Sequence, residues 1–376
     1  MAINWCKLCI LPDSRPGLVF DDYGVCNACR SSATKIDIDW RSRERQFDEL
    51  VKTVKSGAHL YDCLIPVSGG KDSTWQVIKC LEYGLNPLAV TWRPPGRTAV
   101  GQANLDNLIR LGVHHIDFSV APNVEARFML SALKNYGSSA IPMHMAIFNI
   151  PHFIATKFEI PLIVWGENSA FEYGTDDNSL TGVELTNEWL MQHGVMQGTT
   201  VDDWHKMGFA PSDLAPYIQV KAKDLKNFTP KGVFLGYFFK WDPKATKELA
   251  LANGFTSKPV HLKTGVYDFA DIDDDFISIH HWLKWYKFGF TRSFDNLSIE
   301  IREKRITRSA ALSKLRGLGL QKPKADIEKF CDFTNISVAK FEEISNIFRN
   351  ESIWFRHKGT WQIDNFLIDD WDWNEG

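Results

Sequence analysis

The sequence predicts an α/β protein built on a five-stranded parallel sheet, with a zinc ribbon before the sheet and a mainly helical region after it. Between residues 61 and 239, short continuous apolar runs alternate with stretches of helical periodicity. This alternation is typical of strands that are buried on both faces and joined by helical crossovers. Two cysteine pairs precede this part, and mostly helical patterns follow it. We therefore expect three parts, over residues 1–35, 36–241 and 242–376.

Composition and charge limit the classes of protein to consider. The chain has 376 residues, of which 44% are hydrophobic, so it can bury a full core. A net charge of -3 and a pI near 6.4 argue against broad attraction to a nucleic acid backbone. The sequence shows no N-terminal signal peptide and no apolar run near the ~18 residues of a membrane span. We expect a cytoplasmic protein without a membrane segment.

The expected elements follow from hydrophobic periodicity and from glycine and proline breaks. An amphipathic helix over 40–56 connects the cysteine-rich start to the sheet. The five strands are expected at 61–67, 88–92, 113–120, 161–166 and 232–239. The helices between them are expected at 74–83 and 102–111, with two more inside 123–158 that are separated by breaks at Pro142 and Pro151.

The region after residue 242 reads as mainly helical. Its helices are expected at 243–253, 273–287, 295–302, 307–315 and 338–349. The acidic run 271–275 is interpreted as the beginning of a helix, where the helix dipole favours negative charge. Trp282, Trp285 and Tyr286 follow at mixed helical spacing, which more often indicates core packing than a ligand site.

Four of the seven cysteines have the spacing of a zinc ribbon. Cys6 and Cys9 form one C-x2-C pair, and Cys26 and Cys29 form a second after sixteen intervening residues. Disulfides and an iron–sulfur cluster are the alternatives to zinc. Four thiolates leave no open coordination position, so the predicted Zn²⁺ is structural and fastens a segment with too little apolar material to fold alone. The isolated cysteines are expected to be buried and inert: Cys63, Cys80 and Cys331.

The most informative segment is Ser68-Gly69-Gly70-Lys71-Asp72-Ser73, directly behind the first predicted strand. Its two glycines allow a tight turn that aims several backbone N–H groups at one point, and the next helix adds the positive end of its dipole. The lysine and serine side chains add further donors, so we predict a loop that binds the phosphates of ATP. The pattern GxxxxGK[ST] does not fit, because Ile65 stands at its first glycine. An ordinary strand-to-helix connection is the alternative.

Ligands of such sheets bind beside the switch point, at the carboxyl ends of the strands. Three predicted loops meet there. The predicted ATP-binding residues are Val67, Ser68, Gly69, Gly70, Lys71, Asp72, Ser73, Thr91, Trp92 and Gly166. Glu167 is expected to bind Mg²⁺ or a ribose hydroxyl, and Asn168 to hold a substrate amide. With Lys71 and Asp72 they form the predicted catalytic set, although a polar loop that caps a helix remains the alternative.

A basic stretch follows a glycine break in the helical region. Its arginines are predicted to hold a carboxylate or diphosphate of the substrate in bidentate fashion, and a solvated face is the alternative. The predicted residues are Arg292, Arg302, Arg305 and Arg308.

The string SGGKDS resembles the signature of the PP-loop ATP pyrophosphatase superfamily. Members of that superfamily split ATP between the α and β phosphates, and the AMP half activates a carbonyl or amide oxygen. The resemblance implies ATP as a substrate with Mg²⁺ as a cofactor, and the fold of adenine nucleotide alpha hydrolases. It leaves the acceptor open.

Further motifs resemble the WbpG- and PseA-like N-acetyl sugar amidotransferase family. They are LPDSRPGLVFDDYGVCNACR, WGENSAFEYG, LGYFFKWDP and FGFTRSFDNLSIEIREKRITR, in that order between Cys6 and about Arg308. The resemblance implies conversion of an acetamido group on a bacterial surface sugar, such as a UDP-linked diacetamido uronic acid or a nonulosonic acid, to an acetamidino group. It also implies ammonia from a HisH-like glutaminase and a HisF-like cyclase-type subunit. Residues from Lys314 onward carry no recognised motif.

Two other functions are considered beside this one. A tRNA thiolase also joins a cysteine ribbon to a PP-loop, but it would need a basic RNA-binding face and usually a catalytic cysteine near ATP. A non-enzymatic ATP-binding scaffold would use the acidic, tryptophan-rich stretch 369–373 as a docking segment.

Overall fold

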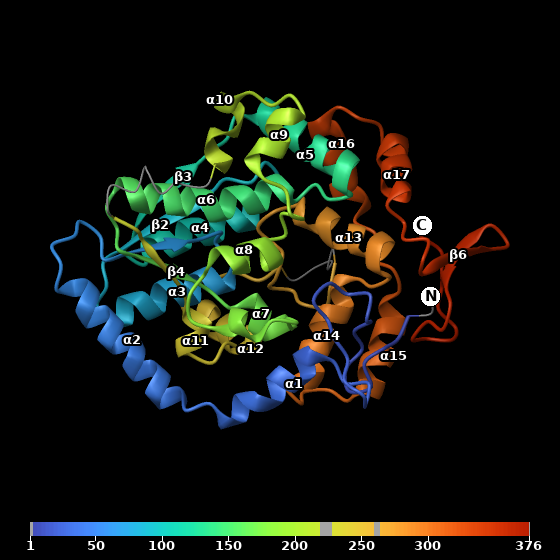
Figure 1. Ribbon diagram of the computed structural model, residues 1–376, viewed down its shortest axis with the longest axis horizontal. Coiled ribbons are helices and arrows are strands. Elements are labelled where there is room, and N and C mark those ends of the chain that lie inside the picture. Colours follow the sequence, from blue (N-terminus) through green and yellow to red (C-terminus); the bar gives the residue numbers. More distant parts are fainter. Residues whose placement is uncertain (1–2, 219–227, 259–263, 376) are drawn as a thin grey trace.

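A five-stranded parallel sheet forms the centre of one half of the molecule. The computed structural model describes residues 3–218, 228–258 and 264–375 (Figure 1). The strand order is β3-β2-β1-β4-β5, and every neighbouring pair is parallel. The strands are β1 (Cys63–Pro66), β2 (Pro87–Trp92), β3 (His114–Phe118), β4 (Leu162–Trp165) and β5 (Lys231–Phe234). The order reverses between β1 and β4, so the predicted fold class is confirmed with its switch point beside β1.

Helices cover both faces of this sheet, and β1 shows why. Cys63 and Ile65 face one apolar core, whereas Leu64 faces another, because successive side chains of a strand point to opposite sides. The surrounding helices are α2 (Trp40–Lys55), α3 (Lys71–Glu82), α4 (Ala99–Arg110), α5 (Pro122–Tyr136) and α6 (Ile141–Lys157). Buried surface on both faces explains the continuous apolar strands of the sequence.

Two expected boundaries in this half are wrong. Helix α6 runs through Pro151, although proline removes a backbone hydrogen bond and costs roughly 3 kcal/mol in a helix interior. Ile150 and Ile154 beside it are buried in the core, and this packing keeps the helix continuous. The fifth strand ends at Phe234, and α11 (Leu235–Phe238) follows. A short apolar run cannot distinguish a strand from a buried helical turn.

The connection between β4 and β5 contains short elements that periodicity did not predict. They are α7 (Ser169–Tyr173), α8 (Asn187–His193), α9 (Val201–Lys206) and α10 (Pro211–Leu214).

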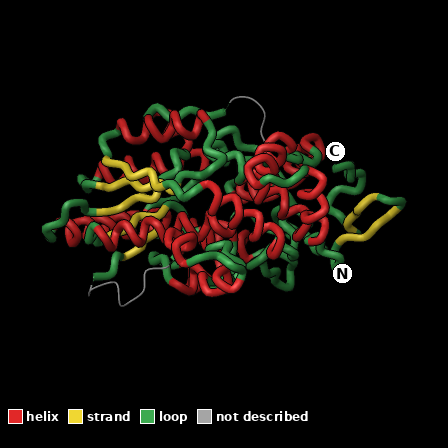
Figure 2. Tube along the Cα trace, turned by 90° about the horizontal axis from the view of Figure 1, so that it is seen from above, coloured by secondary structure: helices red, strands yellow, loops and turns green. Residues whose placement is uncertain are grey.

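The C-terminal region is helical as expected, with additions. Its helices are α12 (Pro243–Ala252), α13 (Ile277–Phe288), α14 (Arg292–Arg302), α15 (Arg308–Leu318), α16 (Lys324–Thr334) and α17 (Val338–Ile347). Helix α16 and the antiparallel hairpin of β6 (Trp354–His357) and β7 (Thr360–Ile363) were not predicted. Figure 2 shows the sheet and this hairpin at opposite ends of the elongated molecule. Helix α13 begins at Ile277, so the acidic run 271–275 lies before the helix and not in its first turn.

The cysteine-rich start packs on the C-terminal region. Figure 1 shows its loops and α1 (Asn27–Thr34) beside α14 and α15. One apolar core joins Cys6 and Ile10 to Trp285 and Phe294. The first 30 residues therefore complete a core that belongs mainly to the C-terminal helices.

The tryptophan-rich end is part of the same core. Trp371 is buried and packs against Phe366, while Trp373 stacks with Trp285 at a ring distance of 6.2 Å. The carboxylate of Glu375 accepts hydrogen bonds from Trp285 Nε1 and the Tyr286 hydroxyl. These contacts contradict the idea of a free acidic docking tail. No helix within the described residues is long and apolar enough to cross a membrane.

Candidate functional site

The SGGKDS segment forms a tight loop between β1 and α3. Gly69 has φ +89°, and a Cβ on it would lie 2.8 Å from the backbone nitrogen of Leu105, so only glycine fits. The loop is closed by two internal hydrogen bonds, because Ser68 N donates to Ser73 Oγ at 3.0 Å and Gly70 N donates to Ser68 Oγ at 3.2 Å.

The N-terminus of α3 is suited to an anion. Its N-cap is Gly70, and the described residues provide no side-chain cap there. The first N–H groups of the helix have no intrahelical acceptor and carry the positive end of the dipole. Lys71 lies at this end and pairs with Asp72, whose other oxygen accepts a hydrogen bond from Trp241 Nε1 at 3.0 Å. The structure thus holds a cation and a carboxylate beside a phosphate-binding helix end.

This loop opens into a cavity of about 450 Å³. The ends of β1, β2 and β4 form one part of its wall, α6 forms another, and the segment 267–277 with α14 completes it. A cavity at the carboxyl ends of parallel strands is where the fold was expected to bind its ligand. Of the predicted site residues, those that line it are Val67, Ser68, Gly70, Lys71, Asp72, Ser73, Trp92, Gly166, Glu167 and Arg292.

Other predicted residues support the site without lining it. Gly69 supplies the turn described above. The Thr91 hydroxyl donates to Val67 O at 2.8 Å and lies 2.9 Å from His115 Nε2, so it fixes the end of β1. Because its hydroxyl group is used in these two contacts, Thr91 has a structural role.

Asn168 is not available to a substrate amide. Its Oδ1 accepts hydrogen bonds from Ala170 N and Trp189 Nε1, and its Nδ2 donates to the carbonyl oxygens of Leu180 and Gly182, all at 2.9–3.1 Å. Both amide donors and both oxygen lone pairs are therefore used. The side chain caps α7 and fixes the connection after β4, which corrects the predicted catalytic role.

Three of the four predicted arginines also have structural partners outside the cavity lining. Arg302 donates to Glu172 O at 3.2 Å, Arg305 pairs with Asp242 and with Glu300 at 3.1 Å, and Arg308 donates to Cys9 O at 3.0 Å. These contacts join α14 and α15 to their neighbours. Arg292 alone of the four lines the cavity.

Glu167 has the electrostatics of a functional carboxyl group. Burial, together with the charge of Asp72, raises the pKa of Glu167 to about 7, although Lys71 opposes the rise. The carboxyl therefore changes its charge near neutral pH. It lines the cavity together with Asp72, and the two offer the oxygen ligands that Mg²⁺ prefers.

Sequence reasoning missed the part of the wall that comes from segment 267–277. Asp271 and Asp273 line the cavity, and the pKa of Asp273 is raised by burial, with a hydrogen bond to the Ser68 side chain opposing the rise. Asp271 has the positive φ of +56° that L-residues rarely adopt, and it accepts a hydrogen bond from Arg292 Nε at 3.1 Å. The sequence shows the run of acidic residues at 271–275. It does not show that this run lies beside the PP-loop.

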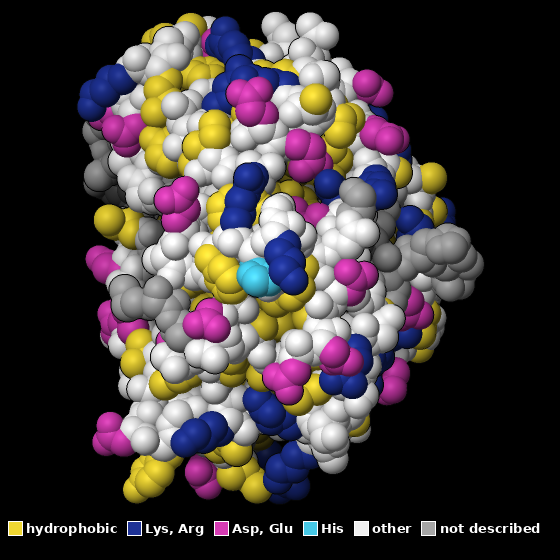
Figure 3. All heavy atoms as spheres, turned by 90° about the vertical axis from the view of Figure 1, so that its right-hand side faces the viewer, with side chains coloured by type: hydrophobic (Ala, Val, Ile, Leu, Met, Phe, Trp, Pro, Cys, Tyr) yellow, Lys and Arg dark blue, Asp and Glu magenta, His cyan; other side chains and the backbone are white. Residues whose placement is uncertain are grey.

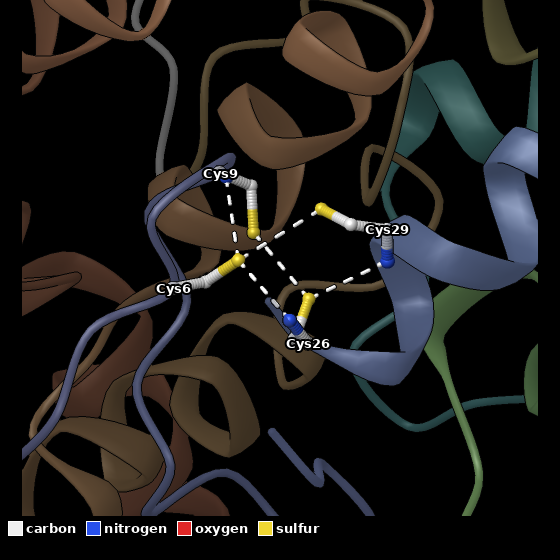
Figure 4. A group of neighbouring side chains, drawn as sticks. All are labelled: Cys6, Cys9, Cys26 and Cys29. Atoms are coloured by element: carbon white, nitrogen blue, oxygen red, sulfur yellow. Dashed lines mark hydrogen bonds between the residues drawn. The ribbon is translucent and has the colours of Figure 1, made fainter. Parts of the chain in front are cut away.

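The four paired cysteines fit a zinc ion. Their sulfur atoms all lie within 4.8 Å of one another and are buried (Figure 4). Cys6 and Cys29 are 4.0 Å apart, and Cys9 and Cys26 are 3.7 Å apart. Tetrahedral ligands at ~2.3 Å from zinc stand about 3.8 Å apart. Backbone N–H groups of Cys9, Cys26 and Cys29 donate to these sulfurs, as expected around thiolates.

Arg302 lies beside this cluster and offsets its charge. Burial opposes the charged form of the guanidinium, but Cys9, Cys29 and Cys26 raise its pKa overall. A Zn²⁺ ion with four thiolates carries a net negative charge, so a buried arginine next to it is favourable. The arginine thus belongs to the metal centre and not to the cavity.

Glu125 fixes the ring of Trp92 in the cavity wall. It accepts a hydrogen bond from Trp92 Nε1 at 2.8 Å and is 3% exposed. Burial raises the pKa of Glu125 to about 8, even though the Trp92 bond opposes the shift. Burial therefore favours the protonated form of this carboxyl group at neutral pH.

Comparison with protein families identifies the C-terminal region. Residues 264–367 match the WbpG-like C-terminal domain of LPS biosynthesis proteins. This match confirms the predicted resemblance over 264–308 and extends it through the hairpin, where the sequence showed no recognised motif. Taken with the PP-loop, this domain indicates an ATP-using PP-loop enzyme. No curated protein matches the chain significantly.

Several solved structures are distantly similar to the chain. NMN synthetase from Francisella tularensis is 17% identical with a TM-score of 0.26, and covers 50% of this chain and 91% of its own. NH3-dependent NAD synthetase from Campylobacter jejuni is 13% identical with a TM-score of 0.30, and covers 60% and 100%. A predicted subunit of tRNA methyltransferase from Methanocaldococcus jannaschii is 15% identical with a TM-score of 0.29, and covers 62% and 90%. Similarity at this level does not define a shared activity.

The metal centre gives a first prediction. Cys26→Ser should release zinc and lower the free energy of unfolding by about 3 kcal/mol or more, because the binding free energy of a structural metal is folding free energy. Metal analysis and thermal melting measure both effects. Cys331→Ser, which changes a buried cysteine outside the cluster, should keep the zinc. A zinc-free Cys26→Ser protein that melts like the wild type would contradict the structural role.

Glu125 gives a second prediction, about pH. Its pKa in the folded protein is above its usual 4.5, so the stability that its neutral form contributes is present at low pH and is lost as pH rises through about 8. Glu125→Gln keeps an acceptor for Trp92 and removes this dependence. The melting temperature of the variant, relative to wild type, should therefore rise between pH 5 and 8.5 without added Mg²⁺. The exposed control Glu328→Gln should show no such trend, and a constant difference for Glu125→Gln would contradict the assignment.

Proposed function

We propose that the protein is an ATP-dependent amidotransferase that converts the acetamido group of a bacterial surface sugar to an acetamidino group. One observation carries the proposal: the PP-loop and the WbpG-like domain line the same cavity. Ser68 and Lys71 contribute from one side, and Asp271 and Arg292 from the other. An acceptor bound to the WbpG-like part would therefore meet ATP at the PP-loop.

The chemistry requires activation of a poor electrophile. Nitrogen donation quenches the amide carbonyl, and its oxygen leaves only after it has been converted to a better leaving group. Transfer of AMP to that oxygen gives an imidate and releases pyrophosphate. Ammonia then adds to the imidate carbon, AMP leaves with the oxygen, and the product is an amidine.

The residues of the cavity suit these steps. Lys71 and the N-terminal N–H groups of α3 would stabilise the charge on departing pyrophosphate. Mg²⁺, held by the phosphates with Asp72 or Glu167, would offset further negative charge. The pKa of Glu167 is about 7, so its carboxylate could accept the proton that ammonia loses after it attacks. The apolar walls from α6 and Phe269 would keep water from the imidate.

The competing tRNA thiolase finds less support. Cys63, Cys80 and Cys331 are buried, and they are not among the residues that line the cavity. The face around the C-terminal hairpin mixes basic and acidic side chains without a continuous basic patch (Figure 3). A UDP-linked diacetamido uronic acid or a nonulosonic acid fits the proposal better than RNA.

The PP-loop lysine provides a direct test. Lys71→Ala should reduce formation of AMP and pyrophosphate at least ~100-fold, because a cation that stabilises the transition state is lost. The measurement is pyrophosphate release with Mg²⁺, ATP, ammonium and a UDP-linked diacetamido uronic acid. Lys79→Ala is the control, since Lys79 lies on the same helix but pairs with Glu82 at the surface. Normal turnover by Lys71→Ala would refute the assigned site.

The source of nitrogen provides a second test. We propose that ammonia is delivered by a glutaminase partner, of the HisH-like and HisF-like type. The isolated chain should then use ammonium but not glutamine, and its rate should increase with pH as more ammonium becomes ammonia. Amidine formation is followed by mass spectrometry with each donor. Efficient use of glutamine by the isolated chain would contradict the partner, and sulfur transfer to tRNA would favour the thiolase.

A further inference from the structure

Three basic side chains from separate parts of the chain meet at one buried carboxylate. Asp295, on α14, is 1% exposed. Arg15 Nε lies 3.1 Å from its Oδ1, while Lys284 Nζ and Arg292 NH1 lie 3.5 and 3.9 Å from its Oδ2. Arg15 comes from the loop after the first cysteine pair, Lys284 from α13 and Arg292 from α14. One carboxylate cannot neutralise three cations.

A fourth cation and a second carboxylate lie nearby, and positive charges still outnumber negative charges. Lys287 follows Lys284 by one turn of α13, and its Nζ lies 3.2 Å from the side-chain amide of Gln197. Asp271 pairs with Arg292. Among the described residues, these two carboxylates therefore pair with three of the cations, and Lys287 adds a fourth positive charge beside them. We call this set the basic cluster: Arg15, Lys284, Lys287 and Arg292.

Three cations of this cluster keep part of their side-chain surface exposed, whereas the central carboxylate of Asp295 is almost fully buried. The side chains of Lys284, Arg292 and Arg15 keep 18%, 16% and 15% of their surface exposed. Arg292 lines the cavity. Tyr173 also lines it, and the Arg15 guanidinium lies 5.8 Å from the centre of that ring. The basic cluster therefore adjoins the cavity wall on the side formed by α14 and α7.

The pKa values of the two lysines are lowered, as expected for ammonium groups without enough negative charge beside them. Burial lowers the pKa of Lys287 to about 8, and Lys284 beside it adds to the effect. Burial also lowers the pKa of Lys284, although Asp295 opposes the shift. A bound anion would reverse both shifts, because it favours the charged lysines.

We propose that the basic cluster is an anion subsite at the edge of the cavity, where it binds a carboxylate or a diphosphate group of the acceptor. This inference rests on the proposed function, since it names the part of the acceptor that the site recognises. A purely structural role, in which the cations only neutralise Asp295, does not explain the cluster, because one cation would be enough. An ammonium path does not explain it either, because excess positive charge repels ammonium.

The placement of the subsite separates the acceptor from ATP. The phosphates of ATP belong to the PP-loop and α3, whereas the cluster is built from α13, α14 and the N-terminal loop. An acceptor anchored there can direct its acetamido group toward the PP-loop within the same cavity. The loop that carries Arg15 is held by the cysteine cluster, so the metal centre also supports acceptor binding.

Binding of simple anions tests the proposal directly. UDP and glucuronate represent the diphosphate and the carboxylate, and each is titrated by calorimetry into protein saturated with Mg²⁺ and a non-hydrolysable ATP analogue, which fills the PP-loop. At least one probe should bind the wild type. Lys284→Gln should weaken that binding about tenfold, and Lys284→Arg should retain it. Binding of UDP alone identifies a diphosphate site, and binding of glucuronate alone identifies a carboxylate site.

The controls separate this inference from the proposed function. Lys340→Gln, on the exposed face of α17, should bind the probes like wild type, and Lys284→Gln should bind the ATP analogue normally. If Lys284→Gln does not fold, Lys287→Gln carries the test, with an expected loss of about threefold because it lies farther from Asp295. No binding of either probe to wild type, or equal binding by the charge-removing variant, would overturn the subsite. Intact probe binding without amidine formation would refute the proposed reaction instead.

Discussion

The backbone contact between the acidic segment 273–275 and the loop after β2 is the constraint on which the site depends. Thr98 N donates to Asp273 O at 3.0 Å, and Asp275 N donates to Gly96 O at 2.8 Å. The chains approach so closely that a Cβ on Gly101 would lie 2.6 Å from Asp273 Cα. This contact seats the WbpG-like region on the nucleotide-binding sheet. Without it, Arg292 and the PP-loop would not share a cavity.

The cysteine cluster has a positional role that extends beyond its own loops. Arg308 Nε donates to Cys9 O, Asn27 Nδ2 donates to Thr175 O, and Arg15 reaches Asp295. The first 30 residues therefore touch α15, the connection after β4 and α14. Four cysteine ligands would leave a bound zinc ion no open coordination position, so the contribution of the cysteine cluster is to hold these three parts in register around the cavity.

Ionisable groups with displaced pKa values surround the cavity, and their signs differ by location. Glu167, Glu125 and Asp273, beside or behind the nucleotide loops, have raised pKa values, which indicates carboxyl groups short of a cation. Lys284 and Lys287, beside α14, have lowered pKa values, which indicates ammonium groups short of an anion. Burial is the main cause of all these shifts, which disfavour the charged carboxylates at one place and the charged ammonium groups at the other. Such paired deficits are common at sites that are completed by their ligands.

The sequence alone determined the sheet, the PP-loop turn and the cysteine cluster, because each depends on local order. Apolar runs define buried strands, two glycines define the turn at Gly69, and the C-x2-C spacing defines the cysteine cluster. Tertiary structure decided what periodicity cannot express: helix α6 continues through Pro151, and α11 replaces the end of the fifth strand. It also decided which polar side chains remain available. The side chain of Asn168 is used in four hydrogen bonds, and Arg302 lies beside the cysteine cluster. Asp271, by contrast, lines the cavity although it lies far from the PP-loop in the sequence. Local spacing says nothing about contacts between segments some 200 residues apart in the sequence, since these depend on how the packed elements meet.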